Sequence, residues 1–194
     1  DVPAGKKVKM TFSASFGEDT KAKLMYGREV WWEQGNMILI NGDPFYAKES
    51  GNRVDFVGET EPAAEYYAIY PEANSSEWEN GTYTFTLPTS SYVLPENISF
   101  QSAAKCQNGE NVLHFTHLLG YVKLTVPEEL GYLTHVEVYA NGGENIAATR
   151  VKVDYSGDRP SLKAAEERIV NVNDLGFGGP GDYYIPLYPG TYSK

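Results

Sequence analysis

Three histidines are the first candidates for chemistry, because imidazole binds metal ions and exchanges protons near neutral pH. His114 and His117 are three positions apart in an apolar stretch, and His135 is distant from both. Successive strand residues point to opposite faces, so this offset places His114 and His117 on opposite sides of a strand. We expect histidines that are packed or hydrogen-bonded within a sheet, and we predict no metal site.

Paired carboxyl groups could hydrolyse a glycoside if they faced each other across a cleft. Glu128-Glu129 and Glu166-Glu167 are adjacent pairs, and adjacent strand residues diverge. The glycine-rich segment 176–181 lacks the Lys-Ser/Thr ending of a phosphate-binding loop. The single cysteine, Cys106, is expected to be a small buried apolar residue. We therefore predict no catalytic residue, no cofactor and no enzymatic activity.

Aromatic side chains remain as candidates for ligand contact, because exposed rings stack on sugars. We expect core packing for Trp31 or Trp32, which precede a buried strand pattern. Trp78 differs, because it lies between two glutamates in the polar segment 72–81, which we expect to be an exposed loop. Trp78 is the candidate exposed contact residue. The alternative is a ring folded back over the sheet.

The bulk composition restricts the partners. The chain of 194 residues carries a formal net charge of -10, and such a surface repels phosphate groups. This argues against nucleic acid and against an anionic membrane surface. No segment approaches the roughly 20 apolar residues of a transmembrane helix. The opening residues D-V-P-A-G-K-K lack the apolar core of a signal peptide and look like the start of a mature or trimmed chain.

The elements that would position these residues are strands. From Val112 to Val126 apolar residues fall on both faces, which predicts one continuous central strand buried on both sides. Only segment 161–168 has helical propensity. Short strands between turn residues predict an all-β sandwich. Segment 7–16 alternates and has one apolar face, formed by Val8, Met10, Phe12, Ala14 and Phe16.

Several short motifs also follow one another in an informative order. They occupy residues 9–14 (K-M-T-F-S-A), 32–40, 56–58, 66–71, 87–88, 115–124 and 184–190. This order resembles that of the fimbrillin-like proteins, which are surface subunits and adhesins of type V pili in anaerobic Gram-negative bacteria.

The resemblance implies two transthyretin-like Greek-key β-sandwich domains, export as a lipoprotein precursor, and assembly by β-strand exchange. We expect residues 1–127 to form the first domain and residues 128–194 a second domain that is short or incomplete. The implied location is the cell surface, in a fimbrium or at the outer membrane. The implied partners are other fimbrial subunits, with host or microbial surface glycans or proteins besides.

Two functions of different classes are therefore in competition. The first is a non-enzymatic fimbrial subunit or adhesin, with the strand Val8 to Phe16 as the candidate exchangeable element. Proteolysis after Lys6, Lys7 or Arg28 would remove it. The alternative is a carbohydrate-binding module of a surface glycan-utilisation system, which predicts glycan binding that is lost in Trp78→Ala.

Overall fold

The computed structural model describes residues 5–16, 31–71, 76–86, 101–132, 136–144, 146–148, 150–164, 169–170, 173–175 and 178–192. Within these ranges every regular element is a β-strand, apart from the short 3₁₀ helix η2, Glu128–Leu130. The all-β prediction is therefore confirmed. None of the described helical residues forms a segment long and apolar enough to cross a membrane.

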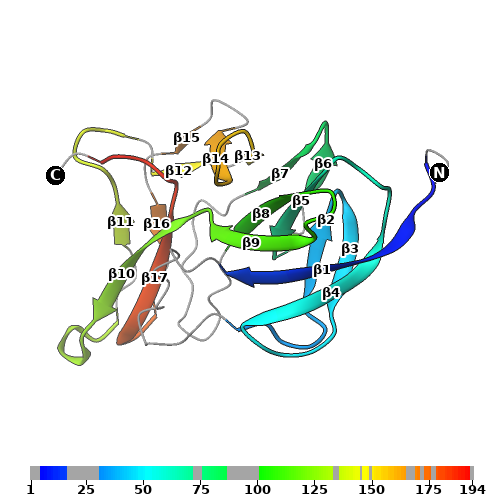
Figure 1. Ribbon diagram of the computed structural model, residues 1–194. Helices are drawn as coiled ribbons and strands as arrows, with labels where there is room; N and C mark the ends of the chain where they lie inside the picture. The colour runs from blue at the N-terminus through cyan, green and yellow to red at the C-terminus, as the bar shows by residue number, and fades with distance from the viewer. Residues whose placement is uncertain are drawn as a thin grey trace.

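A closed barrel of seven strands, in the order β1-β4-β3-β2-β5-β8-β9, forms one end of the molecule (Figure 1). Neighbouring strands are antiparallel, except that β1 and β9 are parallel. The barrel is consistent with the expected sandwich. Its strands are β1 Val8–Phe16, β2 Met37–Ile40, β3 Asp43–Ala47, β4 Arg53–Thr60, β5 Glu65–Tyr70, β8 Ser102–Gln107 and β9 Val112–His117.

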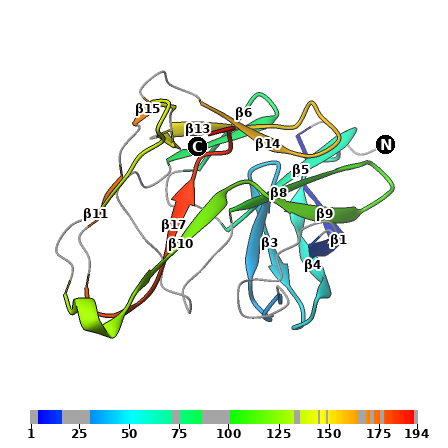
Figure 2. The same cartoon turned by 90° about the vertical axis from the view of Figure 1, so that its left-hand side faces the viewer.

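The remaining strands form smaller sheets beside the barrel. One has four strands in the order β14-β13-β7-β6, and the others are the pairs β10-β17, β11-β16 and β12-β15. Figure 2 shows β10 and β17 running side by side away from the barrel. These strands are β6 Glu77–Glu79, β7 Thr82–Thr86, β10 Gly120–Val126, β11 Val136–Val138, β12 Ala147–Ala148, β13 Arg150–Asp154, β14 Ser161–Ala164, β15 Ile169–Val170, β16 Asn173–Leu175 and β17 Gly181–Leu187.

Two tight turns fix the register of their hairpins. Asn41 and Gly42 join β2 to β3 with φ angles of 50° and 86°. Asn80 and Gly81 join β6 to β7 with φ angles of 51° and 75°. Asn-Gly is the preferred pair for a two-residue hairpin turn in which both central residues have positive φ.

The barrel wall separates two hydrophobic cores. The first core fills the barrel interior and includes Phe12, Trp32 and Phe56. The second lies outside, where Leu39, Ile69 and other wall residues meet the four-stranded sheet. Strands β2, β5 and β8 consequently bury side chains on both faces, because each contributes to both cores.

The continuous strand predicted from Val112 to Val126 is wrong. The structure divides it into β9 and β10, with a break at Leu118-Leu119. The backbone N–H of Leu118 donates to Gln101 O at 2.8 Å, and the Leu118 side chain enters the second core. Apolar residues occur on both faces because successive parts of the segment pack against different hydrophobic cores. β10 itself is mostly exposed, so the central, doubly buried position predicted for it is also wrong.

Two further differences concern the later part of the chain. The sequence favours a helix over 161–168, but Ser161–Ala164 forms strand β14, which pairs with β13. Residues 165–168 lie outside the described ranges. Strand β7 pairs with β13, and β10 pairs with β17, so sheets connect the earlier and later parts of the chain. The domain boundary at residue 127 stays a prediction. The loop expected over 72–81 contains β6, whereas residues 72–75 are not described.

Candidate functional site: the first strand and its groove

Strand β1 closes the barrel. It pairs antiparallel with β4 from Val8↔Thr60 to Ser15↔Arg53, and parallel with β9 from Ser13↔Val112 to Phe16↔Phe115. The strand predicted at residues 8–16 is confirmed. If β1 were absent, β4 and β9 would each present an unpaired row of backbone N–H and C=O groups.

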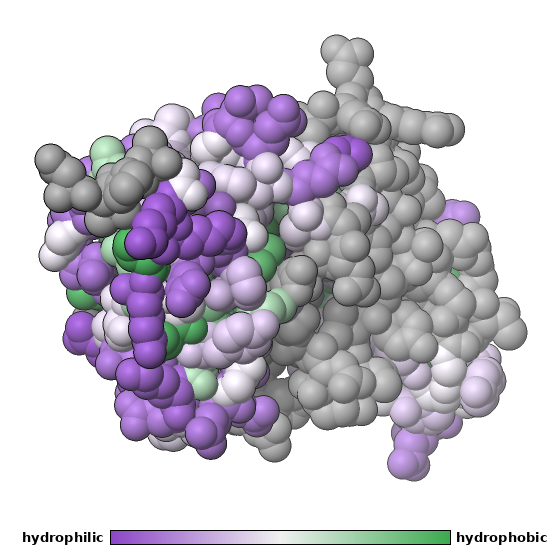
Figure 3. Space-filling model, turned by 90° about the vertical axis from the view of Figure 1, so that its right-hand side faces the viewer, coloured by the Kyte–Doolittle hydropathy of each residue, from purple (hydrophilic) through white to green (hydrophobic). Residues whose placement is uncertain are grey.

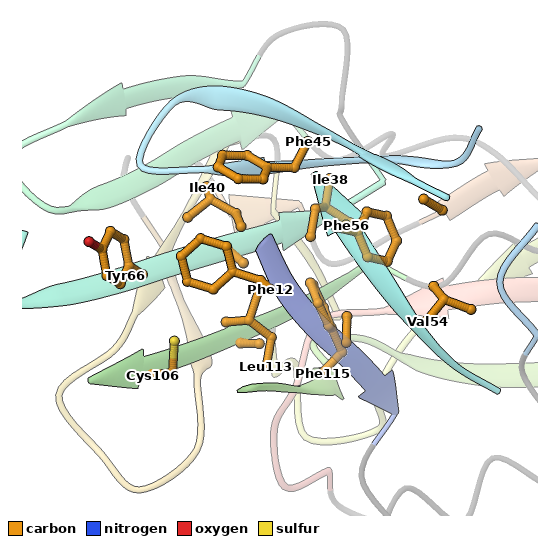
Figure 4. Close-up of a cluster of buried hydrophobic side chains, with 14 of the residues drawn as sticks. Phe12, Ile38, Ile40, Phe45, Val54, Phe56, Tyr66, Cys106, Leu113 and Phe115 are labelled. Carbon is orange, nitrogen blue, oxygen red and sulfur yellow. The ribbon is translucent and has the colours of Figure 1, made fainter. Parts of the chain in front are cut away.

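The inward face of β1 supplies part of the barrel core. Phe12 and Ala14 are fully buried, and Met10 and Phe16 are half-buried against the same core. The Phe12 ring meets Phe45 edge-on, with centroids 5.4 Å apart, and Tyr66 at 4.9 Å. Figure 4 shows Phe12 pointing into the cluster among Ile40, Tyr66 and Leu113. The groove that β1 fills is therefore apolar at alternate positions along the strand.

Phe16 anchors the far end of β1 in a group of aromatic rings. It stacks on Trp32, with centroids 4.6 Å apart, and on the imidazole of His117 at 5.4 Å. Trp32 is fully buried, whereas Trp31 is 56% exposed. The core role expected for one of the two tryptophans therefore belongs to Trp32.

The outward face of β1 and the lysine before it make polar contacts near the surface. The ammonium of Lys7, just before the strand, forms an ion pair with Asp43. Arg53 Nε donates to Ser13 Oγ at 3.0 Å, and Ser15 Oγ lies 3.2 Å from His114 Nδ1. Exposed pairs of this kind are screened by water and salt. The apolar face therefore holds β1 in place more strongly than the polar face.

His117, at this end of the groove, makes the stability of the folded protein depend on pH. Burial lowers the pKa of His117 from 6.5 to about 4. Between these values the unfolded chain binds a proton that the folded chain does not, so the folded state loses stability as the pH falls. We expect the free energy of unfolding to fall by about 2–3 kcal/mol from this group between pH 6.5 and pH 4, measured by urea denaturation.

The matched comparison uses the neighbouring histidine. His114 lies on the opposite, exposed face of β9. His117→Gln should remove this contribution to the pH dependence, and His114→Gln should leave it in place. Equal pH profiles for the two variants would contradict the assignment to His117.

Trp78, the candidate exposed contact, is half-buried in β6. Its ring packs on Tyr83, with centroids 4.6 Å apart, and lies 6.0 Å from Tyr67. A Cβ added at Gly42 would lie 2.8 Å from Trp78 Cδ1, so the indole also covers the β2–β3 turn. This placement corresponds to the alternative of a ring folded over a sheet. A contact role for Trp78 stays a prediction.

The other residues considered for chemistry are dispersed. His114 and His117 project from opposite faces of β9, as their spacing indicated. The described residues contain no group of three or more histidine, cysteine, aspartate or glutamate side chains that could hold a metal ion. Burial raises the pKa of the Cys106 thiol to about 11, which disfavours the nucleophilic thiolate. Arg28, His135 and the pair Glu166-Glu167 lie outside the described residues.

Comparison with known proteins does not assign a family. No family model, no curated protein and no solved structure matches the chain. The functional argument consequently depends on the geometry of β1, on the residues around it, and on the motif order described above.

Proposed function

We propose that this protein is a non-enzymatic cell-surface fimbrial subunit or adhesin that assembles by β-strand exchange. The observation that carries the proposal is the place of β1 between β4 and β9, with Phe12 and Ala14 fully buried in the barrel. A strand from another subunit with the same alternation would satisfy both backbone edges and the apolar groove. Backbone pairing supplies affinity, and the alternating side chains specify the register.

The proposal includes the finer details of fold and location. The barrel and the strands after it would represent two transthyretin-like Greek-key domains, the second short or incomplete. The protein would be exported as a lipoprotein precursor and act in a fimbrium or at the outer membrane. Its partners would be other subunits, with surface glycans or proteins as adhesion targets. The motif order over residues 8–126 supports this assignment.

Whether proteolysis can release β1 from the barrel depends on which side of the strand the backbone is cleaved. Lys6 and Lys7 precede β1, so cleavage after either would leave the strand joined to the barrel. A cut in the segment between Phe16 and Trp31 would separate β1 from the remaining strands. Arg28 lies in that segment, among the residues that are not described.

The test introduces a unique protease site between Phe16 and Trp31. After cleavage, a fluorescent peptide with the sequence of residues 8–16 should replace the bound strand, as measured by fluorescence anisotropy. The uncut protein, in which β1 is tethered, should capture much less peptide. A peptide carrying Phe12→Asp should fail, because its carboxylate would enter a fully apolar core.

Association between subunits is measured separately. Cleaved protein freed of its β1 peptide should form higher oligomers in light scattering, and an excess of the peptide should suppress them. The proposal fails if the freed protein stays folded, stays monomeric and captures neither the peptide nor another subunit.

A further inference from the structure

A polar cavity of about 560 Å³ lies between the barrel wall and the four-stranded sheet. Residues of β5 and β8 line one side, and residues of β13, β14 and the β6–β7 turn line the other. Its volume is within the range of small-ligand sites. The cavity is distinct from the β1 groove and is not used by strand exchange.

The charge of the cavity is opposite to that of the protein. Lys105, Lys152 and Lys163 line it together with the carboxylates of Glu65 and Asp154, which leaves one positive charge in excess. The whole chain carries a net charge of -10. A locally positive cavity in an acidic protein attracts an anion that the remaining surface repels.

Two of the lysines face each other. Lys152 on β13 and Lys163 on β14 are cross-strand partners, and like charges in directly opposite positions destabilise a sheet. Asp154 offsets one of them, because its carboxylate lies 2.5 Å from the Lys163 ammonium. Within the described ranges, no carboxylate forms an ion pair with Lys152. A bound anion would therefore neutralise a charge that the fold leaves unbalanced.

The remaining lining supplies hydrogen-bonding groups and an aromatic ring. Lys105 Nζ is held by a hydrogen bond of 2.7 Å to Tyr155 O. The hydroxyl of Tyr67 donates to Glu65, and the Tyr67 ring packs against Tyr155, with centroids 4.8 Å apart. The Asn80 amide adds neutral hydrogen-bonding groups at the turn. The cavity thus combines cations, an aromatic surface and an amide.

We propose that this cavity binds a carboxylated sugar residue of an acidic glycan. The carboxylate would lie on Lys152 and Lys105, the apolar face of the ring on Tyr67, and hydroxyl groups near Asn80. One carboxylate on the bound sugar residue matches the single excess charge of the lining. This inference does not depend on strand exchange, because an unpolymerised chain contains the same cavity.

The test is calorimetric titration of the intact chain with three probes. Sialyllactose and a galacturonic acid trisaccharide carry the carboxylate on different sugars, and lactose is the uncharged comparison. We expect one or both acidic probes to bind, lactose not to bind, and affinity to fall as salt is added. Binding of only one acidic probe would identify the source of the sugar. Failure of both acidic probes, or equal binding of lactose, would overturn the proposal.

Substitutions at Lys152 locate the binding. Lys152→Gln is expected to weaken binding of the acidic probe about tenfold, and Lys152→Arg to retain it, because the charge persists. Lys9→Gln makes the same charge change at an exposed strand position outside the cavity lining and should leave affinity unchanged. Equal losses in Lys152→Gln and Lys9→Gln would show that only net charge matters and would also overturn the proposal. Circular dichroism verifies that each variant is folded.

Discussion

Replacing Phe12 by alanine is expected to lower the free energy of unfolding by about 3–5 kcal/mol. Phe12 is fully buried and touches Phe45 and Tyr66 from the middle of β1. The truncation removes apolar contact and leaves a cavity in a closed barrel, where neighbouring strands cannot easily move inward. Urea denaturation monitored by circular dichroism measures the change. A peptide of residues 8–16 with the same substitution should bind the cleaved protein much more weakly.

The control for Phe12 lies on the outer face of the same strand. Lys9 is exposed and pairs with Glu59 of β4 in the ladder. Lys9→Thr keeps the strand preference and should change the free energy of unfolding by less than about 0.5 kcal/mol. Similar losses in Phe12→Ala and Lys9→Thr would contradict the assignment of β1 stability to its inward face.

Gly58→Ala is expected to destabilise the barrel by about 3 kcal/mol, the upper end of the usual cost of overpacking. A Cβ at Gly58 would lie 2.5 Å from Pro44 O and 2.7 Å from Phe45 Cγ. Gly58 also opposes Met10 across the β1–β4 ladder. Backbone of β3 cannot rotate away as a side-chain tip can, so β3 or β4 must shift. The loss should appear as a lower urea midpoint with an unchanged slope.

Gly120 provides the matched substitution. It is likewise a strand residue, at the start of β10, but a Cβ added there would meet no atom within 4 Å. Gly120→Ala should leave stability unchanged or raise it slightly, since alanine reduces the freedom of the unfolded chain. If both glycine variants lost stability equally, close approach of β3 and β4 would not be the cause.

Local patterns predicted single strands more successfully than their partners. The alternation of residues 8–16 identified β1 and its inward face, because one face of β1 packs on one core. The same reasoning failed from Val112 to Val126, where residues pack on different cores on either side of Leu118. Sequence periodicity predicts that a side chain is buried, but it does not predict which other residues pack against that side chain.

The candidate sites show the same contrast: the residues of a single strand could be predicted, and the residues that they meet could not. The inward residues of β1 were recognisable, but β9, with which β1 pairs, is distant in sequence: Ser15 pairs with His114, 99 positions later. Trp78 was expected in a loop because two glutamates flank it, and those glutamates alternate outward from β6. The lysines of the cavity gave no signal, because Lys105 of β8 and Lys152 of β13 line one cavity only in the folded chain.

The parallel pairing of β1 with β9 also has a consequence for the order in which we expect the barrel to form. Three other barrel pairs join strands that are near in sequence: β2 with β3, β3 with β4, and β8 with β9. Bringing β1 to β9 closes a long loop, which costs conformational entropy and slows formation of the contact. We therefore expect the barrel to close late, after the pairs that close shorter loops have formed. Until then the slot beside β9 is open to any nine-residue strand of suitable alternation, its own or that of a neighbour.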